Sequence, residues 1–339
     1  MIDLRSDTVT LPTKEMLEAI LESKLGDDVS REDETVNTLE ETAAEMLGKE
    51  AGLLVTSGTQ GNLVSIMTHT IPGDEVYMEA ESHVYYYEVG GISAIAGVIP
   101  HLIPGNRGQI PPEILEKELR PPNIHLPNPR LVVIENTHNR AGGTVIPPEN
   151  IKAIADISHD RGLSLHIDGA RIFNAAVALN MDVAKLVEPA DSVTFCLSKG
   201  LSAPIGSVIV GSEEFIEKAR KNRKMLGGGM RQAGVIAAPG LVALKTMIER
   251  LKEDHENAKI LADKLSLIEN LKVWPVETNI VVVDLSETKY QSAKFLQELE
   301  SHGVKAVPFG TTLVRFVTHR MISREEVLQA ASIVASILQ

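Results

Sequence analysis

The chain has 339 residues, of which 43% are hydrophobic and 23% are charged, which excludes a disordered chain and indicates a large globular domain with a smaller one. The net charge of −13 argues against nucleic acid as a partner, because an acidic surface repels phosphate backbones. The single cysteine, Cys196, excludes an intrachain disulfide and a cysteine-based metal site. Neither a signal peptide nor an apolar run of membrane-spanning length is recognised, so we expect a cytoplasmic protein with no membrane partner.

The first two thirds of the chain predict alternating helices and strands. Residues 13–23 and 34–47 are typical of amphipathic helices. Apolar runs of strand length follow at residues 52–56, 75–78, 98–102, 131–135, 164–168, 192–196 and 207–210. Helical stretches lie between most of these runs, at residues 62–70, 113–119 and 148–161 among others. This alternation predicts an α/β fold with a mostly parallel sheet that helices cover on both faces.

The pattern changes after residue 240. Residues 240–266 predict one long helix. Short strands are then expected at residues 271–274, 279–284, 304–307 and 313–318, and helices at residues 289–302 and 323–338. We therefore expect a large domain at residues 1–245, whose N-terminal arm contributes to the active site, and a smaller α+β domain at residues 246–339.

Residues 57–62 (SGTQGN) follow a predicted strand and begin a predicted helix. Small residues let the backbone approach a ligand closely, and the first amides of a helix attract an anion such as phosphate. Taken alone, this segment is better explained as a capped turn between a strand and a helix.

Two polar residues stand at the ends of predicted strands. Asp168 ends the strand at residues 164–168, at the edge where open α/β sheets bind ligands, so it is suited to hold a protonated ring nitrogen. A helix cap explains Asp168 equally well. Lys199 follows the strand at residues 192–196, and a lysine that is partly removed from water can form an imine, although a solvated loop lysine is the usual case. Cys196 is interpreted as a small buried residue.

The three segments together are more specific than any one of them. In chain order they give a phosphate turn, a strand-end aspartate and, about 30 residues later, a strand-end lysine. Pyridoxal phosphate (PLP) requires these partners: an anion site, a group that pairs with its ring nitrogen, and a lysine that forms a Schiff base. The sequence therefore predicts a PLP-dependent enzyme.

The sequence resembles a known family over nearly its whole length. The matching segments are residues 1–10 (MIDLRSDTVT), 26–29 (GDDV), 57–62 (SGTQGN), 135–139 (ENTHN), 166–174 (HIDGARIFN), 196–201 (CLSKGL), 223–232 (RKMLGGGMRQ) and 313–319 (LVRFVTH). They are similar to the low-specificity L-threonine and L-allo-threonine aldolases of PLP fold-type I, the aspartate-aminotransferase-like fold. The resemblance implies a seven-stranded sheet and a lyase that cleaves L-threonine, L-allo-threonine and related β-hydroxy amino acids to glycine and an aldehyde. It also implies a homodimer with shared active sites, paired into a homotetramer.

The resemblance assigns cofactor roles to matching residues. Lys199 would be the Schiff-base lysine, and Asp168 would pair with the pyridine nitrogen. His83 would stack on the ring and assist proton transfer. The phosphate would be bound by three residues at the helix start, Ser57, Gly58 and Thr59.

Further residues would bind the substrate. Ser6, Arg171 and Arg315 would hold its carboxylate, which a planar guanidinium group matches in shape. Arg171 would also contact the cofactor, and Arg231 would contact its phosphate from a neighbouring subunit. His125 matches a family histidine near the substrate hydroxyl. No metal is expected.

Several alternatives remain open. The base for the substrate hydroxyl is His83, His125 or a water between them. Family members commonly have Tyr-Gly where this chain has Ser30 and Arg31, a departure that bears on the substrate more than on the reaction type. The same site suits a transaminase, a racemase or a β-eliminating lyase, because geometry determines which bond breaks. A non-catalytic PLP-binding protein is the other alternative, and the intact set of site residues argues against it.

Overall fold

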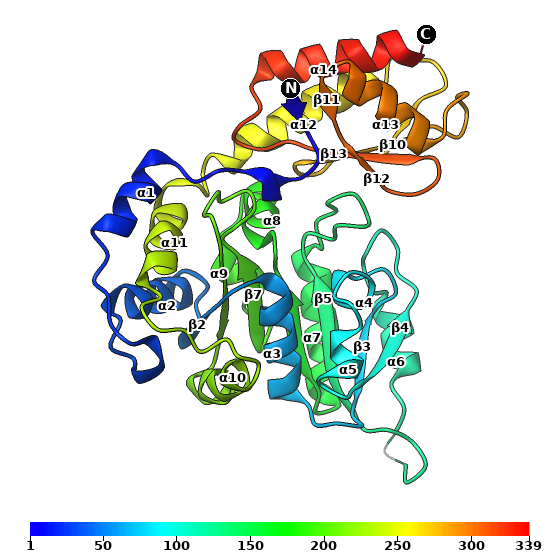
Figure 1. Cartoon of the computed structure of the whole chain (residues 1–339). Helices are drawn as coiled ribbons and strands as arrows, with labels where there is room; N and C mark the ends of the chain where they lie inside the picture. Colours follow the sequence, from blue (N-terminus) through cyan, green and yellow to red (C-terminus); the bar gives the residue numbers. More distant parts are fainter. Residues whose placement is uncertain (122, 339) are drawn as a thin grey trace.

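The computed structural model describes residues 1–121 and 123–338, and Figure 1 shows a large α/β body with a smaller unit beside it. The strands of the central sheet are β2 (Ala51–Val55), β3 (Glu75–Glu79), β4 (Ile99–Ile103), β5 (Pro129–Glu135), β6 (Ser164–Asp168), β7 (Ser192–Cys196) and β8 (Ser207–Gly211). Their order is β2-β8-β7-β6-β5-β3-β4, and β8 runs antiparallel to β2 and β7 while the other neighbours are parallel. The predicted α/β fold with a mostly parallel seven-stranded sheet is confirmed.

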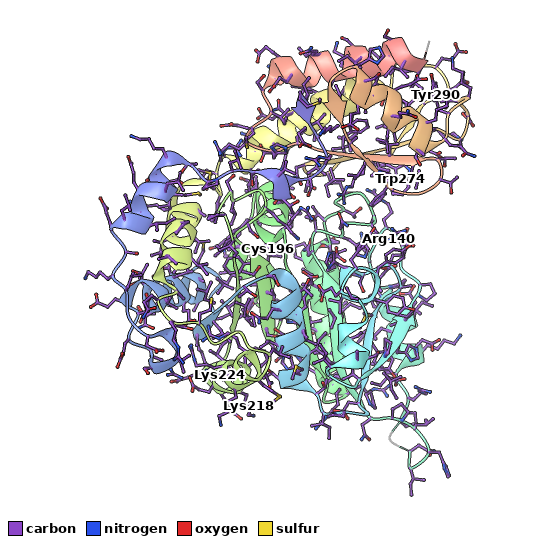
Figure 2. All side chains as sticks on the ribbon, in the orientation of Figure 1. Arg140, Cys196, Lys218, Lys224, Trp274 and Tyr290 are labelled. Atoms are coloured by element: carbon purple, nitrogen blue, oxygen red, sulfur yellow. The ribbon has the colours of Figure 1, made fainter. Side chains whose placement is uncertain are left out.

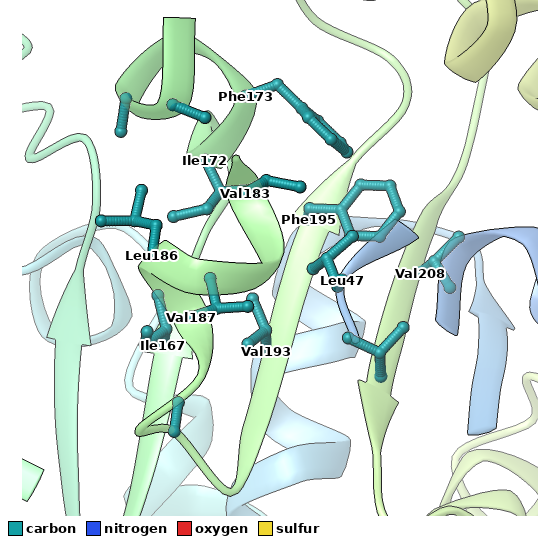
Figure 3. Close-up of a cluster of buried hydrophobic side chains, with 14 of the residues drawn as sticks. Leu47, Ile167, Ile172, Phe173, Val183, Leu186, Val187, Val193, Phe195 and Val208 are labelled. Atoms are coloured by element: carbon teal, nitrogen blue, oxygen red, sulfur yellow. The ribbon is translucent and has the colours of Figure 1, made fainter. Parts of the chain in front are cut away.

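Helices cover both faces of this sheet, because successive strand residues point to opposite sides and both sides are apolar. Leu53 and Val55 of β2 pack with Phe215 on one face, whereas Leu54 between them belongs to the core on the other face. Figure 3 shows part of this second core, where Phe195 of β7 packs against Phe173 of the helix at Ile172–Leu179. The helices of the body are α1 (Lys14–Leu21), α2 (Glu34–Met46), α3 (Gly58–His69), α4 (His83–Tyr86), α5 (Gly91–Ala94), α6 (Pro112–Glu118), α7 (Pro148–Asp160), α8 (Ile172–Leu179), α9 (Val183–Val187), α10 (Glu213–Met225) and α11 (Gly234–Thr246).

The smaller unit has its own sheet and its own apolar core. An antiparallel sheet contains β9 (Lys272–Val273), β10 (Ile280–Asp284), β12 (Val307–Pro308) and β13 (Leu313–Val317), in the order β12-β13-β10-β9. Helices α12 (Leu251–Leu265), α13 (Ser292–Ser301) and α14 (Arg324–Leu338) pack on it. Strand β1 (Ile2–Asp3) pairs with β11 (Val304–Lys305), and Ile2 and Leu4 are buried in this core. Residues 2–4 therefore pack in the smaller unit, and the boundary between residues 245 and 246 stays a prediction.

Two predicted elements are divided in the structure. The long helix predicted at residues 240–266 is wrong, because α11 ends at Thr246 and α12 begins at Leu251. Helix α11 buries Ala243 and Leu244 in the core of the large sheet, whereas α12 buries Leu261 in the core of the smaller unit. Likewise, the strand predicted at residues 304–307 is two strands, since β11 pairs with β1 and β12 pairs with β13. The chain turns between these elements, so Ala243 and Leu261 reach different cores, and β11 and β12 join different sheets.

Two further observations concern Cys196 and the helices. Figure 2 shows Cys196 inside the large body, where it is a free, buried cysteine as predicted. In the described parts of the chain, the helices are too short or too polar to cross a membrane.

Candidate active site

The predicted catalytic residues follow the carboxyl ends of parallel strands. Asp168 is the last residue of β6, and Lys199 lies three residues beyond the end of β7. His83 begins helix α4, after β3. Because parallel strands end at one edge of the sheet, these three residues gather there.

A cavity of about 350 Å³ lies between this edge and the smaller unit. It brings together Ser6, His83, Arg171, Lys199 and Arg315, as predicted. Its remaining lining residues are Thr8, Tyr87, Asn139, Val307, Pro308 and Phe309. A larger cavity of about 1000 Å³ lies beside α8 and α12, but none of the predicted site residues lines it.

Asp168 is a buried carboxylate without a counter-charge of its own. It is 2% exposed, and it accepts hydrogen bonds from the Ala170 N–H (3.1 Å) and from the Asn62 side chain (2.9 Å). Among the described residues it has no ion-pair partner within 4 Å. A buried carboxylate is stabilised by a cation, so Asp168 is suited to receive a protonated ring nitrogen.

Helix α3 presents its amino end beside β7. Ser57 caps the helix by accepting a hydrogen bond from the Gln60 N–H, and the N–H groups of Gly58 and Thr59 have no acceptor among the described residues. A Cβ atom at Gly58 would lie 2.9 Å from the Cys196 sulfur, so only glycine fits against the strand end. Free amides at a helix start bind phosphate, which supports the predicted roles of these three residues.

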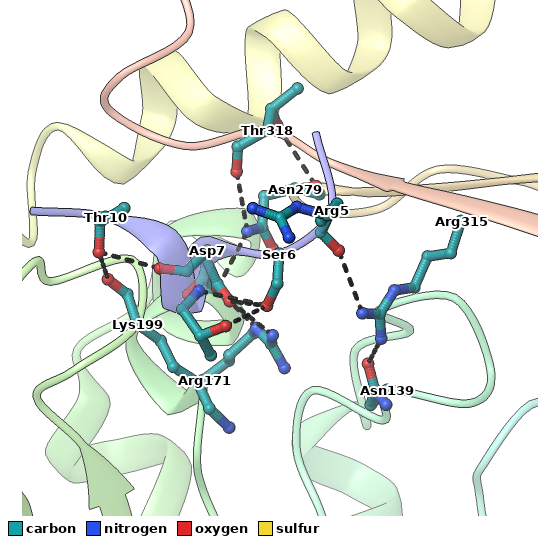
Figure 4. Close-up of polar contacts among 12 residues, drawn as sticks. Arg5, Ser6, Asp7, Thr10, Asn139, Arg171, Lys199, Asn279, Arg315 and Thr318 are labelled. Atoms are coloured by element: carbon teal, nitrogen blue, oxygen red, sulfur yellow. Dashed lines mark hydrogen bonds and ion pairs between the residues drawn. The ribbon is translucent and has the colours of Figure 1, made fainter. Parts of the chain in front are cut away.

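The N-terminal segment packs on the loop that carries Lys199. The Thr10 hydroxyl lies within 2.9 Å of both the Lys199 and the Asp7 carbonyl oxygens (Figure 4). The Ser6 side chain caps the short helix Asp7–Val9 by accepting from the Thr8 N–H. The predicted contribution of the N-terminal arm to the cavity agrees with this arrangement.

Arg171 is paired within the chain. Its Nε and Nη2 atoms each donate to the Asp7 carboxylate at 2.7 Å, and both side chains are buried. Burial acts against the charge of Asp7, but the Arg171 guanidinium lowers the pKa of Asp7 well below its usual range. Since Asp7 occupies one edge of the guanidinium, Arg171 cannot bind a substrate carboxylate through that edge, and only Nη1 remains without a hydrogen bond among the described residues.

Arg315 has no carboxylate partner in the described chain. It donates to the Asn139 side chain at 2.7 Å and to the Arg5 carbonyl at 3.3 Å, and its Nε atom is buried without a hydrogen-bond partner. Burial, together with the charge of Arg171, lowers the pKa of Arg315 to about 10, so it remains charged at neutral pH. Arg315 is therefore the stronger candidate for binding a substrate carboxylate.

Two buried glutamates position His83. The Glu135 carboxylate accepts from the His83 backbone N–H at 2.6 Å and from the Asn139 N–H at 2.8 Å, so it supports both the histidine and the residue that holds Arg315. Glu88 lies 3.0 Å from His83 Nδ1. Burial lowers the pKa of His83, but the Glu88 hydrogen bond and the negative charges of Asp168 and Glu135 raise it above its usual value.

Aromatic residues form the outer wall of the cavity. Arg140 donates to the Tyr87 hydroxyl at 3.0 Å and lies 3.9 Å from the centre of the Tyr86 ring. Phe309, from the smaller unit, lies about 5.5 Å from both Arg140 and Arg315. Residues 85–87 are three consecutive tyrosines, of which Tyr87 lines the cavity, and Arg140 contacts both Tyr86 and Tyr87.

Two predicted residues lie away from the cavity within one chain. His125 is exposed and precedes the first residue of β5, so roughly 20 Å of strand separates its end of the sheet from Glu135 at the other. Arg231 is 62% exposed and pairs with Asp27 at 2.8 Å. The chain alone therefore does not bring His125 to the site, and a phosphate contact from Arg231 stays a prediction.

The altered loop faces helix α10 rather than the cavity. Arg31 has a positive φ of 60°, a conformation that favours glycine, and its guanidinium pairs with Glu217. Ser30 is exposed. The charge of Arg31 is thus neutralised by Glu217, and Arg31 does not line the cavity described above.

Several site residues were not predicted. Asp7, Asn62, Glu135 and Asn139 lie inside segments that carry the resemblance, which was a signal that could have found them. Glu88 has only a weak signal, an acidic residue that follows three tyrosines.

The class of protein follows from a family model described as beta-eliminating lyase, which matches residues 3–288. The chain belongs to this family of lyases. Full-length relatives place it among the threonine aldolases of the family. It is 45% identical to the probable low-specificity L-threonine aldolase 2 of Arabidopsis thaliana (96% of this chain, 94% of the relative). It is 40% identical to the low specificity L-threonine aldolase of Escherichia coli K12 (98% of each). A solved Leishmania major threonine aldolase shares the fold, with a TM-score of 0.86 at 18% identity over 100% of both chains.

Proposed function

We propose that the protein is a PLP-dependent aldehyde-lyase that cleaves L-threonine, L-allo-threonine and related β-hydroxy amino acids to glycine and an aldehyde. The observation that carries this proposal is one cavity lined by a lysine, a histidine and an arginine without a counter-charge, namely Lys199, His83 and Arg315. The names of the full-length relatives support the same reaction.

The residues present fit PLP. Asp168 is a buried carboxylate without a cationic partner among the described residues, and the Gly58 and Thr59 amides, which have no acceptor there either, suit a phosphate. Lys199 follows the strand end against which Gly58 packs. When bound, PLP supplies an electron sink for the negative charge that develops at the substrate α-carbon.

The chain's own residues then bind the substrate and move one proton. Arg315 binds the carboxylate, assisted by Ser6 and the free Nη1 of Arg171, because all three face the cavity. The β-hydroxyl proton is taken by His83 or by a water that His83 holds, since His125 does not line the cavity. As the Cα–Cβ bond breaks the aldehyde leaves, and one proton returned to the α-carbon gives glycine. Positioned acid–base groups contribute about 10²–10⁴ in rate.

Absorbance and product analysis test this function. The purified protein should take up PLP and show the absorption band of a lysine-bound cofactor, which Lys199→Ala should alter. Wild-type protein should form glycine and acetaldehyde from threonine or allo-threonine, and Lys199→Ala should not. A wild-type protein that never binds PLP would overturn the cofactor assignment, and PLP binding without glycine from any β-hydroxy amino acid would remove the aldolase assignment.

We also propose a cytoplasmic homodimer with shared active sites, paired into a homotetramer. The resemblance and the exposed apolar side chains near α4, with Val89 97% exposed and Tyr86 51% exposed, support this proposal. The buried, unpaired Cys196 is consistent with a reducing compartment. Sedimentation analysis should give a mass of two or four chains, and a stable monomer with full activity would contradict shared sites.

A further inference from the structure

One buried amide connects two carboxylates behind the cavity. The Asn62 side chain lies 2.9 Å from the Asp168 carboxylate and 2.9 Å from the Glu88 carboxylate, and the three residues are each no more than 4% exposed. None of the three lines the cavity directly. Asn62 and Glu88 are therefore placed to act on the site through Asp168 and His83.

The hydrogen-bond directions follow from the chemistry of the groups. A carboxylate only accepts, so the Asn62 nitrogen faces Asp168 and Glu88, and the Asn62 oxygen faces His166 Nε2 at 3.3 Å. The amide oxygen also only accepts, so His166 Nε2 carries a proton. Burial lowers the pKa of His166 to about 3, which leaves its Nδ1 free to accept a hydrogen bond from Ser192 at 2.8 Å.

The same reasoning extends to the far end of helix α3. Ser192 donates its proton to His166, so its oxygen accepts from His69 Nε2 at 2.8 Å. Every donor from His69 to Asn62 thus points toward Asp168 and Glu88. Such a chain of bonds holds the Asn62 amide in one orientation, because a flipped amide would place its oxygen against both carboxylates.

Glu88 fixes the histidine of the cavity. Its carboxylate lies 3.0 Å from His83 Nδ1, and His83 is its only ion-pair partner in the described chain. Burial raises the pKa of Glu88, but its Oε1 atom accepts from the Asn62 amide and is also the atom that faces His83 Nδ1. The proton of a neutral His83 ring therefore lies on Nδ1, and Nε2 is left without one. An unprotonated ring nitrogen is what a base needs to take the proton of a hydroxyl group.

We propose that Asn62 and Glu88 are positioning residues of the aldolase site: Asn62 holds Asp168 as a hydrogen-bond acceptor, and Glu88 keeps the His83 proton on Nδ1 so that Nε2 receives the substrate proton. The second half rests on the proposed function. The His69–Ser192–His166 chain keeps Asn62 in the required orientation.

Nitrogen NMR of the full-length protein, labelled with ¹⁵N-histidine, reads the proton position directly. At a pH where the ring is neutral, His83 should carry its proton on Nδ1, with its signals assigned by their loss in His83→Asn. Glu88→Leu should move the proton to Nε2, whereas Glu88→Gln should retain it on Nδ1 because its amide oxygen still accepts. A wild-type proton on Nε2, or no change in Glu88→Leu, would overturn the role of Glu88.

Measurements of PLP affinity test the role of Asn62. Asn62→Asp places a third carboxylate beside Asp168 and Glu88, so PLP affinity should fall about tenfold or more and the cofactor absorption should titrate at a different pH. Asn62→Ala removes the amide without adding charge and serves if the aspartate variant does not fold. Ser65→Ala is the matched control, since Ser65 is buried one turn further along α3 and, among the described residues, its hydroxyl has a hydrogen bond only with Thr194. Wild-type affinity in both Asn62 variants would reject the proposal.

Kinetics separate positioning from binding. Glu88→Leu should lower kcat by about 10²-fold with little change in KM, because Glu88 does not line the cavity, and Glu88→Gln should recover much of the loss. An unchanged kcat in Glu88→Leu would contradict the proposal. If the wild type forms no glycine but the NMR and cofactor results are as expected, the proposed function fails while the positioning roles stand.

Discussion

Arg171 and Arg315 reach the same cavity from two different sheets, and their charges are balanced in different ways. Arg171 follows β6 of the large sheet and is held at both Nε and Nη2 by the buried Asp7 carboxylate. Arg315 lies on β13 of the smaller sheet and, in the described part of the chain, donates only to the neutral oxygens of Asn139 and Arg5. The sequence resemblance gives both arginines one task, and the structure separates them: the Arg171–Asp7 pair fixes the N-terminal arm, and Arg315 keeps its charge for a ligand.

The largest expected effect is a loss of stability when the Arg171–Asp7 ion pair is broken. Asp7→Asn leaves a buried guanidinium without its counter-charge, so the free energy of unfolding should fall by about 3–5 kcal/mol. Urea denaturation measures this change. Asp3→Asn, which breaks an exposed pair with Arg5, is the control and should change stability by about 1 kcal/mol or less. Equal effects of the two substitutions would show that Asp7 is not a structural anchor.

Removing Arg315, the arginine without a carboxylate partner among the described residues, should lower catalytic efficiency. Arg315→Met deletes the proposed partner of the substrate carboxylate, a loss of about 2–5 kcal/mol, which corresponds to about 30-fold or more in kcat/KM for threonine. Steady-state kinetics of the PLP-loaded enzyme measure it. Arg315→Lys should recover part of the loss, because it keeps the charge without the planar fork. If Arg315→Met retains the wild-type kcat/KM, Arg171 and not Arg315 is the residue that binds the substrate carboxylate.

Acid should weaken the Arg171–Asp7 ion pair over a defined pH range. The pKa of Asp7 is lowered in the folded state, so its contribution is complete above the unfolded value of about 3.9 and is lost as the pH falls below it. Wild-type stability should therefore lose about 1 kcal/mol more than Asp7→Asn between pH 5 and pH 3. Urea midpoints at both pH values measure the difference, and parallel losses in the two proteins would argue that Asp7 is not ionised in the fold.

The smallest expected effect is on the free energy of unfolding, and its sign is opposite to that of Asp7→Asn. Burial disfavours the charged form of Arg315, as its lowered pKa of about 10 indicates, so the folded state bears a penalty at neutral pH that an apolar side chain removes. Arg315→Met should leave the free energy of unfolding unchanged or raise it by about 1 kcal/mol. Thermal unfolding of the cofactor-free protein measures this, and a loss comparable to that of Asp7→Asn would make Arg315 a structural residue.

Much of the cofactor site could be predicted from the sequence because its signals are local. The strands at residues 164–168 and 192–196 were predicted with the bounds that the structure shows, so Asp168 and Lys199 were placed correctly at strand ends. The turn at residues 57–62 was likewise placed at a helix start, where Ser57 is the cap. Apolar periodicity and capping chemistry act over a few residues, so a sequence reveals them.

The partners of these residues could not be predicted in the same way. Asp7 is 164 positions from Arg171, Asn62 is 106 positions from Asp168, and Asn139 is 176 positions from Arg315. An acidic or amide side chain carries no local sign of the group that it meets after folding. For the same reason, the sequence did not show that Arg231 pairs with Asp27 in its own chain or that His125 lies beyond the far end of β5.

The sequence by itself determined the α/β class, the lysine and aspartate at two strand ends, the turn at residues 57–62 that begins a helix, and the family. Only the tertiary structure decided how the charges are distributed: Asp7 neutralises Arg171, Arg315 keeps its charge, and Asn62 connects Asp168 with Glu88 and, through Glu88, with His83. The physical reason is that helix and strand patterns depend on neighbours along the chain. Ion pairs and buried hydrogen bonds depend instead on which side chains packing brings within about 3 Å of one another.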